Sequence, residues 1–178
     1  MTERSTTFPS RELDLVAFLG ALCLFLSTVE YLIPKPIPFL RVGIANLPVL
    51  IGLELLSPSQ LFLVVLLKVV GQGLVNGTLA SYVFLFSASG SFASGAAMIL
   101  AHRVMRGRIS AVGVSVTGAL AGNIAQIVLA RYLIFGEGAW LIAPPILAIG
   151  TVTSVLLGLF ARRFSRTSRW LASVRARA

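Results

Sequence analysis

The residues with the most chemical potential are polar side chains that interrupt long apolar segments. Lys68, Gln72 and Asn76 follow one another at intervals of four residues, and Asn123 and Gln126 are three residues apart. In a helix, residues at these intervals share one face. Such groups are costly to bury in hydrocarbon, so they usually face a cavity or another helix. An ammonium and several amides can hold a small solute by hydrogen bonds, and the pattern therefore predicts a binding site.

Further polar residues are expected at a similar depth, just beneath the outer membrane face. Glu30 and Asn46 lie near the outer ends of their predicted helices, and Ser89 lies in the outer half of its own. Hydrogen-bonding groups that converge from five helices are what a solute pocket open to the outside needs. The predicted substrate-binding residues are Asn46, Lys68, Gln72, Asn76, Ser89, Asn123 and Gln126.

Structural interpretations of the same residues remain open. Small residues also pack membrane helices together, and the pairs Gly73-x3-Gly77 and Gly118-x3-Gly122 fit the GxxxG packing pattern. A serine can bond a carbonyl of its own helix. Lys68 could pair with Glu54 and neutralise it, in place of lining a pocket.

Catalytic and metal-binding motifs are missing. The chain has one aspartate, Asp14, and five scattered glutamates, whereas Mg²⁺-dependent diphosphate chemistry uses clustered carboxylates. It has no Walker A loop, no nucleophile elbow and no H-E-x-x-H motif. The single cysteine, Cys23, lies in an apolar run, and the single histidine, His102, lies among arginines. We therefore expect no catalysis, no metal site and no cofactor.

Composition indicates which elements must position the polar residues. Of the 178 residues, 57% are hydrophobic and 12% are charged, and the mean hydropathy is +0.93. A soluble domain carries roughly 25% charged residues, so most of this surface must face lipid. Because a helix needs about 20 apolar residues to cross a bilayer, the length allows six spans and no second domain.

The sequence thus predicts an all-α integral membrane protein with about six transmembrane helices in a single membrane domain, 1–178. A cytoplasmic N-terminus at 1–12 precedes the helical bundle at 13–161, and a basic tail follows at 162–178. The predicted spans are 13–33, 43–56, 59–78, 81–104, 109–134 and 139–161. Three prolines between positions 34 and 38 predict a stiff loop after the first span.

The distribution of positive charge predicts the orientation. With the N-terminus inside, the inner segments hold eleven basic residues: Arg4, Arg11, Arg103, Arg106, Arg108 and the six arginines from Arg162 to Arg177. The outer side holds three, Lys35, Arg41 and Arg131. This asymmetry predicts two cytoplasmic termini in an inner membrane. The C-terminal arginines are expected to bind anionic lipid head groups, and nucleic acid is not an expected partner.

The three outer cations have two interpretations that the sequence leaves open. Lys35 and Arg41 flank the proline-rich loop, and Arg131 lies close to the outer face. Long basic side chains snorkel to the membrane interface for structural reasons alone. They could also attract an anionic solute.

Several linked blocks resemble a known family. They are LRVGIANL at 40–47, NGT at 76–78, SASGS at 87–91 with Met98, and VGVSVTGA at 112–119 with Asn123 and Gln126. Together they resemble the Gx transporter family, many of whose members are labelled heptaprenyl diphosphate synthase component I. The resemblance covers about residues 13 to 135. One departure is Gly122, where the family usually has histidine before the asparagine.

That family is in turn similar to the substrate-binding S-components of energy-coupling factor (ECF) transporters. This resemblance implies a six-helix protein that captures a small solute or vitamin outside and then topples against a transmembrane coupling protein driven by two ATPases. It also implies that Ala17 and Ala21 face the coupling protein, and that the proline-rich loop, with Glu30, Lys35 and Arg41, forms the gate over the pocket. The prenyl-synthase label disagrees with the missing aspartates, so we treat it as a name.

Two other functions remain open from the sequence. The chain could be a non-catalytic membrane subunit that serves isoprenoid, quinone or electron-transfer machinery. It could also be an ion-coupled secondary carrier, in which Glu30, Glu54 and Lys68 would matter most.

Overall fold

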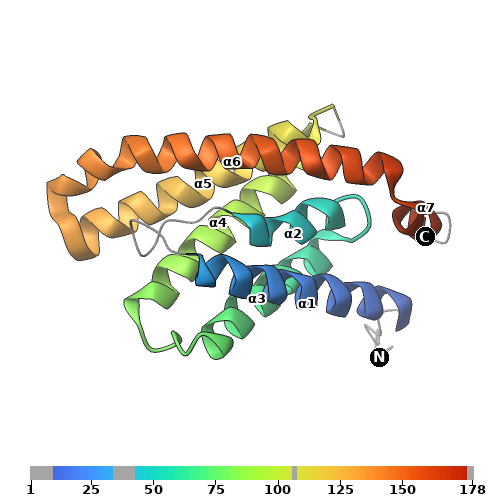
Figure 1. The fold of residues 1–178 in the computed structure, drawn as a ribbon, viewed down its shortest axis with the longest axis horizontal. Helices are drawn as coiled ribbons and strands as arrows, with labels where there is room; N and C mark the ends of the chain where they lie inside the picture. The colour runs from blue at the N-terminus through green and yellow to red at the C-terminus, as the bar shows by residue number, and fades with distance from the viewer. Residues whose placement is uncertain (1–9, 34–42, 106–107, 176–178) are drawn as a thin grey trace, which may run out of the picture.

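The computed structural model describes residues 10–33, 43–105 and 108–175, and within them every regular element is helical (Figure 1). The long helices are α1 (Ser10–Leu32), α3 (Pro58–Val75), α4 (Tyr82–Val104), α5 (Ala111–Ala130) and α6 (Ala139–Thr167). The short elements are η1 (Ile44–Asn46), α2 (Leu47–Gly52), η2 (Arg131–Phe135), η3 (Gly136–Gly138) and α7 (Arg169–Arg175). The predicted all-α class is confirmed.

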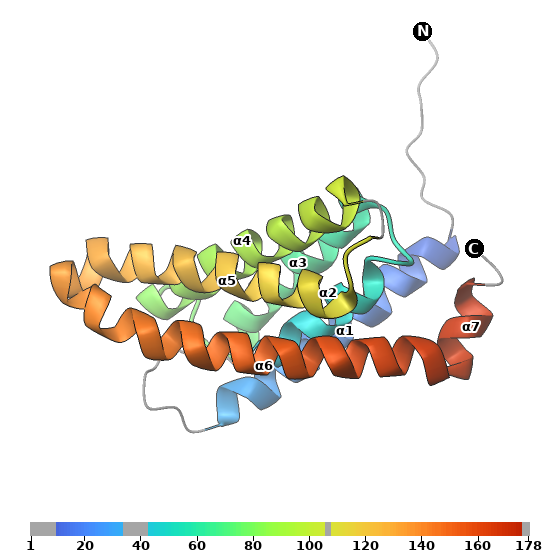
Figure 2. The same ribbon diagram turned by 90° about the horizontal axis from the view of Figure 1, so that it is seen from above.

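Four described segments are long and apolar enough to cross a membrane: Glu12–Leu32, Pro58–Val75, Tyr82–Val104 and Ala111–Thr167. The last of these contains both α5 and α6, which fold back on each other through η2 and η3 (Figures 1 and 2). These segments indicate a membrane protein. The count of six spanning helices stays a prediction.

The predicted short helix over 43–56 corresponds to two helical elements in the structure, and its crossing of a membrane stays a prediction. The chain forms η1 and then α2, whose six residues rise only about 9 Å. Gly43 has a φ of 83°, a left-handed conformation that no helix continues, and Pro48 starts α2 because a first helical turn does not need its missing N–H. Residues 48 to 53 are all buried, so α2 is an internal half-helix among longer helices.

The long helices pack as neighbours in chain order. Contacts join α1 to α3, α3 to α4, α4 to α5 and α5 to α6, while α2 contacts α1, α3, α5 and α6. The beginning of α1 and the C-terminal α7 lie at the same end of the bundle in both views (Figures 1 and 2). The described chain therefore begins and ends at one end of the bundle. Which side is cytoplasmic stays a prediction.

The predicted basic tail begins inside a helix, because α6 continues to Thr167. After a break at Ser168, α7 packs back onto the bundle: Leu171 is fully buried, and the ring of Trp170 lies 5.4 Å from that of Phe18 in α1. Arg162, Arg163, Arg166 and Arg169 are exposed around this break. This placement agrees with a basic end facing anionic head groups.

The two predicted GxxxG pairs behave differently. A Cβ atom at Gly122 would lie 2.8 Å from the carbonyl oxygen of Gly90, so α5 and α4 approach through their backbones, and the packing prediction for this pair is confirmed. Gly77, by contrast, has a φ of 64° and ends α3, where the N–H of Thr78 donates to the carbonyl of Gly73. For Gly77 the packing prediction is wrong.

The α5–α6 hairpin yields a stability prediction at Gly158. A Cβ atom there would lie 2.5 Å from Cα of Val112 and 3.0 Å from its nitrogen, and backbone atoms cannot rotate away. We expect Gly158→Ala to destabilise the protein by about 1–3 kcal/mol, measured as earlier thermal unfolding in detergent. Gly138→Ala is the matched control, because a Cβ atom there has no atom within 4 Å. Equal stability of the two variants would contradict the close α5–α6 contact.

Candidate functional site

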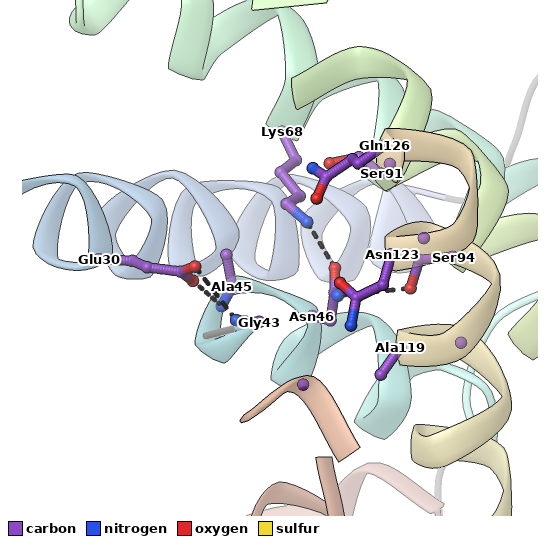
Figure 3. A pocket seen from close by; sticks show the side chains of 14 residues that line it. Glu30, Gly43, Ala45, Asn46, Lys68, Ser91, Ser94, Ala119, Asn123 and Gln126 are labelled. Carbon is purple, nitrogen blue, oxygen red and sulfur yellow. Dashed lines mark hydrogen bonds between the residues drawn. The ribbon is translucent and has the colours of Figure 1, made fainter. Parts of the chain in front are cut away.

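A small cavity lies between α1, η1, α3, α4, α5 and α6 (Figure 3). Its lining includes four of the predicted binding residues, Asn46, Lys68, Asn123 and Gln126, and the predicted gate residue Glu30. The cavity has a volume of about 40 Å³, which is enough for about three water molecules. Residues distant in sequence thus meet at a polar cavity inside an apolar bundle.

Lys68 is the most deeply buried charged residue of this lining, with 2% of its surface exposed. Its Nζ donates a hydrogen bond to Oδ1 of Asn46 at 2.5 Å, and Nδ2 of Asn46 donates to Oγ of Ser94 at 3.4 Å (Figure 3). Asn46 therefore links α3 to α4 from its place in η1. The structure places Lys68 in the cavity wall, while Glu54 is exposed and accepts a hydrogen bond from Ser165 in α6.

Glu30 fixes the turn that carries Asn46. Its buried carboxylate accepts hydrogen bonds from the backbone N–H of Gly43 at 3.1 Å and from that of Ala45 at 3.4 Å (Figure 3). Such bonds to a carboxylate are stronger than neutral ones. Since Asn46 follows Ala45 directly, the position of the Asn46 amide depends on the carboxylate of Glu30.

The two amides of α5 each bond a backbone carbonyl of a neighbouring helix. Nδ2 of Asn123 donates to Ile146 in α6 at 3.5 Å, and Nε2 of Gln126 donates to Phe86 in α4 at 3.1 Å. Each amide also lies against a glycine of that same helix. A Cβ atom at Gly150 would lie 2.0 Å from Nδ2 of Asn123, and one at Gly90 would lie 2.6 Å from Nε2 of Gln126. Glycine at these positions leaves the space that the amides occupy.

The other predicted binding residues do not line the cavity. Gln72 accepts a hydrogen bond from Ser87, Asn76 caps the end of α3, and the hydroxyl of Ser89 donates to the carbonyl of Phe86 in its own helix. The reason for the first two is helical rotation. Each residue turns an α-helix by about 100°, so a residue four positions on is rotated by about 40° around the helix axis and lies about 6 Å further along it. Two such steps carry Asn76 away from the face of Lys68.

The outer cations contribute little to the described cavity. Lys35 and Arg41 lie outside the described residues. Arg131 forms an ion pair with Glu137 at 2.5 Å and stacks on the ring of Trp140, with 5.5 Å from Cζ to the ring centroid. Arg131 is thus engaged at the surface and does not line the cavity.

The proposed partner face on α1 is open in the described structure. Ala17 and Ala21 are exposed, as is the neighbouring ring of Phe25, while the half-exposed ring of Phe18 contacts Trp170 of α7. In a membrane this face contacts lipid or another protein.

Sequence reasoning missed part of the cavity wall. Ser91, Ser94 and four glycines, Gly90, Gly118, Gly122 and Gly150, line it as well. Gly90 with Ser94, and Gly118 with Gly122, are spaced by four residues, which was a usable signal because each pair shares a helix face. From the sequence, Gly118 and Gly122 are predicted as packing residues.

Fold and site together define a polytopic helical membrane protein with a polar internal cavity. The family model described as heptaprenyl diphosphate synthase component I matches residues 19–164, and the chain belongs to this family. The resemblance seen in the sequence blocks is therefore confirmed. Comparison with curated proteins and with solved structures gives no significant match.

The stability that comes from the hydrogen bonds of Glu30 to the N–H groups of Gly43 and Ala45 can be tested by Glu30→Gln. The amide keeps one acceptor but turns an N–H₂ group toward one of the two backbone donors, so we expect a loss of about 1–3 kcal/mol in stability, seen by thermal unfolding in detergent. Glu137→Gln removes the same charge at an exposed ion pair, where about 0.2–1 kcal/mol is typical. If the Glu30 variant proved as stable as the Glu137 variant, the hydrogen bonds of Glu30 would contribute nothing measurable to the free energy of unfolding.

Proposed function

We propose that this protein is the non-catalytic, solute-capturing subunit of an energy-coupled uptake transporter, similar to the S-component of ECF transporters. The observation that carries the proposal is the convergence of Lys68, Asn46, Asn123 and Gln126 on one cavity inside an apolar bundle. Polar groups at such a depth are expensive and usually serve a substrate path or site. The proposed location is the inner membrane, with both termini cytoplasmic.

The size of the cavity bears on how capture would work. Pockets for drug-sized ligands have volumes of about 300–1,000 Å³, well above the 40 Å³ available here. A vitamin-sized solute therefore requires the elements around the cavity to move apart. The half-helix α2 and η1 are suited to this, because they are short and lie between long helices (Figure 1).

Transport by this protein would need an external energy source. The sequence has no nucleotide-binding motif, so the proposed partners are a transmembrane coupling protein and ATPase subunits. The exposed Ala17–Ala21 face of α1 is the proposed contact, since small residues let another helix approach closely.

Solute capture is tested by Asn123→Leu. Leucine fills the amide's place without hydrogen bonds, and we expect the amount of small molecule that co-purifies with the protein to fall to background in mass spectrometry of the denatured protein. Asn76→Leu is the control, because Asn76 does not line the cavity and its Nδ2 has no hydrogen-bond partner among the described residues. Retention of the solute by the Asn123 variant would reject the cavity as the binding site.

Coupling is tested by Ala21→Trp. The indole would separate α1 from a partner helix, so we expect uptake into cells to be lost while the purified protein still binds its solute. Ala148→Trp, at an exposed position of α6, is the control and should transport normally. Uptake that survives Ala21→Trp and ATP depletion, but collapses with an uncoupler, would favour an ion-coupled carrier.

The family's description favours a second candidate, a membrane subunit that assists prenyl diphosphate synthesis. The described cavity lining carries one ammonium, Lys68, and one carboxylate, Glu30, and the described residues hold no group of three or more metal-ligating side chains. A diphosphate usually needs several cations or Mg²⁺. Co-purification with a prenyl synthase, and no effect of Ala21→Trp on any activity, would favour this candidate.

A further inference from the structure

We propose that the captured solute is a slender amphipathic molecule. Its polar end binds in the cavity described above, and its hydrocarbon end fills a second cavity beside it. The inference rests on the proposed function, because it names the chemical class of the solute. It goes beyond that function by assigning a second part of the binding site.

The second cavity shares part of its wall with the first. Its volume is about 20 Å³, and Gly43, Asn46 and Ala119 line both cavities. Gly43 has no side chain, and that of Ala119 is a single methyl group, so Asn46 has the largest side chain of the three (Figure 3). Movement of this one side chain would therefore join the two cavities.

The second cavity lies further along the bundle than the first. On α5 the first cavity reaches Gln126, and the second reaches Ser115. On α6 Gly150 lines the first cavity, and Leu157 lines the second. Both shifts lead toward the end of the bundle where α5 begins and α6 ends. Gln126 follows Ser115 by eleven residues, about 16 Å along a helix, so the joined cavities would suit an elongated solute.

The two cavities differ in the chemistry of their walls. The first is lined by the charged side chains of Lys68 and Glu30 and by the amides of Asn123 and Gln126. The described wall of the second has no charged side chain. Its largest apolar residues are Leu47, Leu50, Met98 and Leu157. A solute that occupies both cavities would thus meet polar groups at one end and mainly hydrocarbon at the other.

Two of the polar side chains in the second cavity are bonded to groups elsewhere. The hydroxyl of Ser154 donates to a carbonyl of its own helix at 2.8 Å. The amide of Asn46 bonds Lys68 and Ser94, and both of these line the first cavity. Ser115 is the remaining polar side chain of the described wall. Because a buried water needs about two to four polar partners, hydrocarbon suits this cavity better than water does.

The opening that the proposed function requires would enlarge both cavities together. Asn46 of η1 lines both of them, and Leu47 and Leu50 of α2 line the second. A displacement of these two short elements would therefore widen the polar and the apolar part in one movement. Each methylene group that then moves from water to the apolar wall would strengthen binding about fourfold.

The experiment uses the full-length protein with the molecules that it carries from the cell. Molecules released by denaturation are identified by mass spectrometry for the wild type, Leu157→Trp and Leu156→Trp. The indole at position 157 would fill the second cavity. Leu156 lines neither described cavity and is 61% exposed, so Leu156→Trp is the matched control. Co-purified lipid and detergent are distinguished from the solute because they stay with Asn123→Leu, which loses only the solute.

We expect the wild type and Leu156→Trp to release the same solute, with polar groups at one end and a hydrocarbon portion at the other. Leu157→Trp should release none. The wild type should also bind an analogue that lacks one methylene group at the hydrocarbon end about fourfold more weakly than the solute itself. This last comparison needs no variant and decides the matter even if Leu157→Trp fails to fold.

Three outcomes would overturn the inference while solute capture stands. They are a solute that is polar throughout, retention of the solute by a folded Leu157→Trp protein, and equal affinity for the shortened analogue. If Asn123→Leu releases the same molecules as the wild type, the proposed function itself is rejected, and the inference with it.

Discussion

The structure depends on the cost of placing an ammonium inside an apolar bundle. A charged lysine in a membrane interior is expensive unless polar groups surround it. Here the Asn46 amide meets Lys68, the Ser94 hydroxyl meets Asn46, and the Glu30 carboxylate holds the turn on which Asn46 lies. Four elements of the fold, α1, η1, α3 and α4, are joined by this one set of hydrogen bonds.

Glycine explains why a cavity exists at all in so tightly packed a bundle. Gly122 lets α5 approach the backbone of α4, while Gly90 and Gly150 leave room for the amides of Gln126 and Asn123. Glycines in neighbouring helices therefore let the helices approach closely and also leave space for polar side chains. One backbone geometry accounts for the close approach of the helices and for the space that the two amides occupy.

Much of the fold could be predicted from the sequence, because long apolar runs that end at turn residues define membrane helices directly. The segments around 13–33, 59–78 and 81–104 agree with α1, α3 and α4 to within a few residues. The segment 43–56 was predicted as a short helix, but its division into η1 and α2 could not be predicted, because the start of η1 depends on the positive φ of Gly43 and on the distant carboxylate of Glu30.

The candidate site was predictable in part for a similar reason. A buried charge such as Lys68 and a pair such as Asn123 and Gln126 are conspicuous in an apolar helix, and both line the cavity. Gln72 and Asn76 were equally conspicuous, yet helical drift and the end of α3 take them elsewhere. The spacing of residues in one helix shows which side chains share a face. Whether that face lines a cavity depends on how the other helices pack around it.

In the proposed transport mechanism, α1 connects the cavity to the surface that would contact the coupling protein. This helix carries Glu30 near one end, where it holds η1, and the exposed Ala17–Ala21 face nearer the other. Glu30 and Ala21 are nine residues apart, about 13 Å along a continuous helix. A solute in the cavity would lie against Asn46 and Glu30, which both line it, and would therefore change the contacts of η1 with α1. Because a helix transmits such a change as a rigid body, filling the cavity would shift the same α1 surface that a coupling protein is proposed to contact.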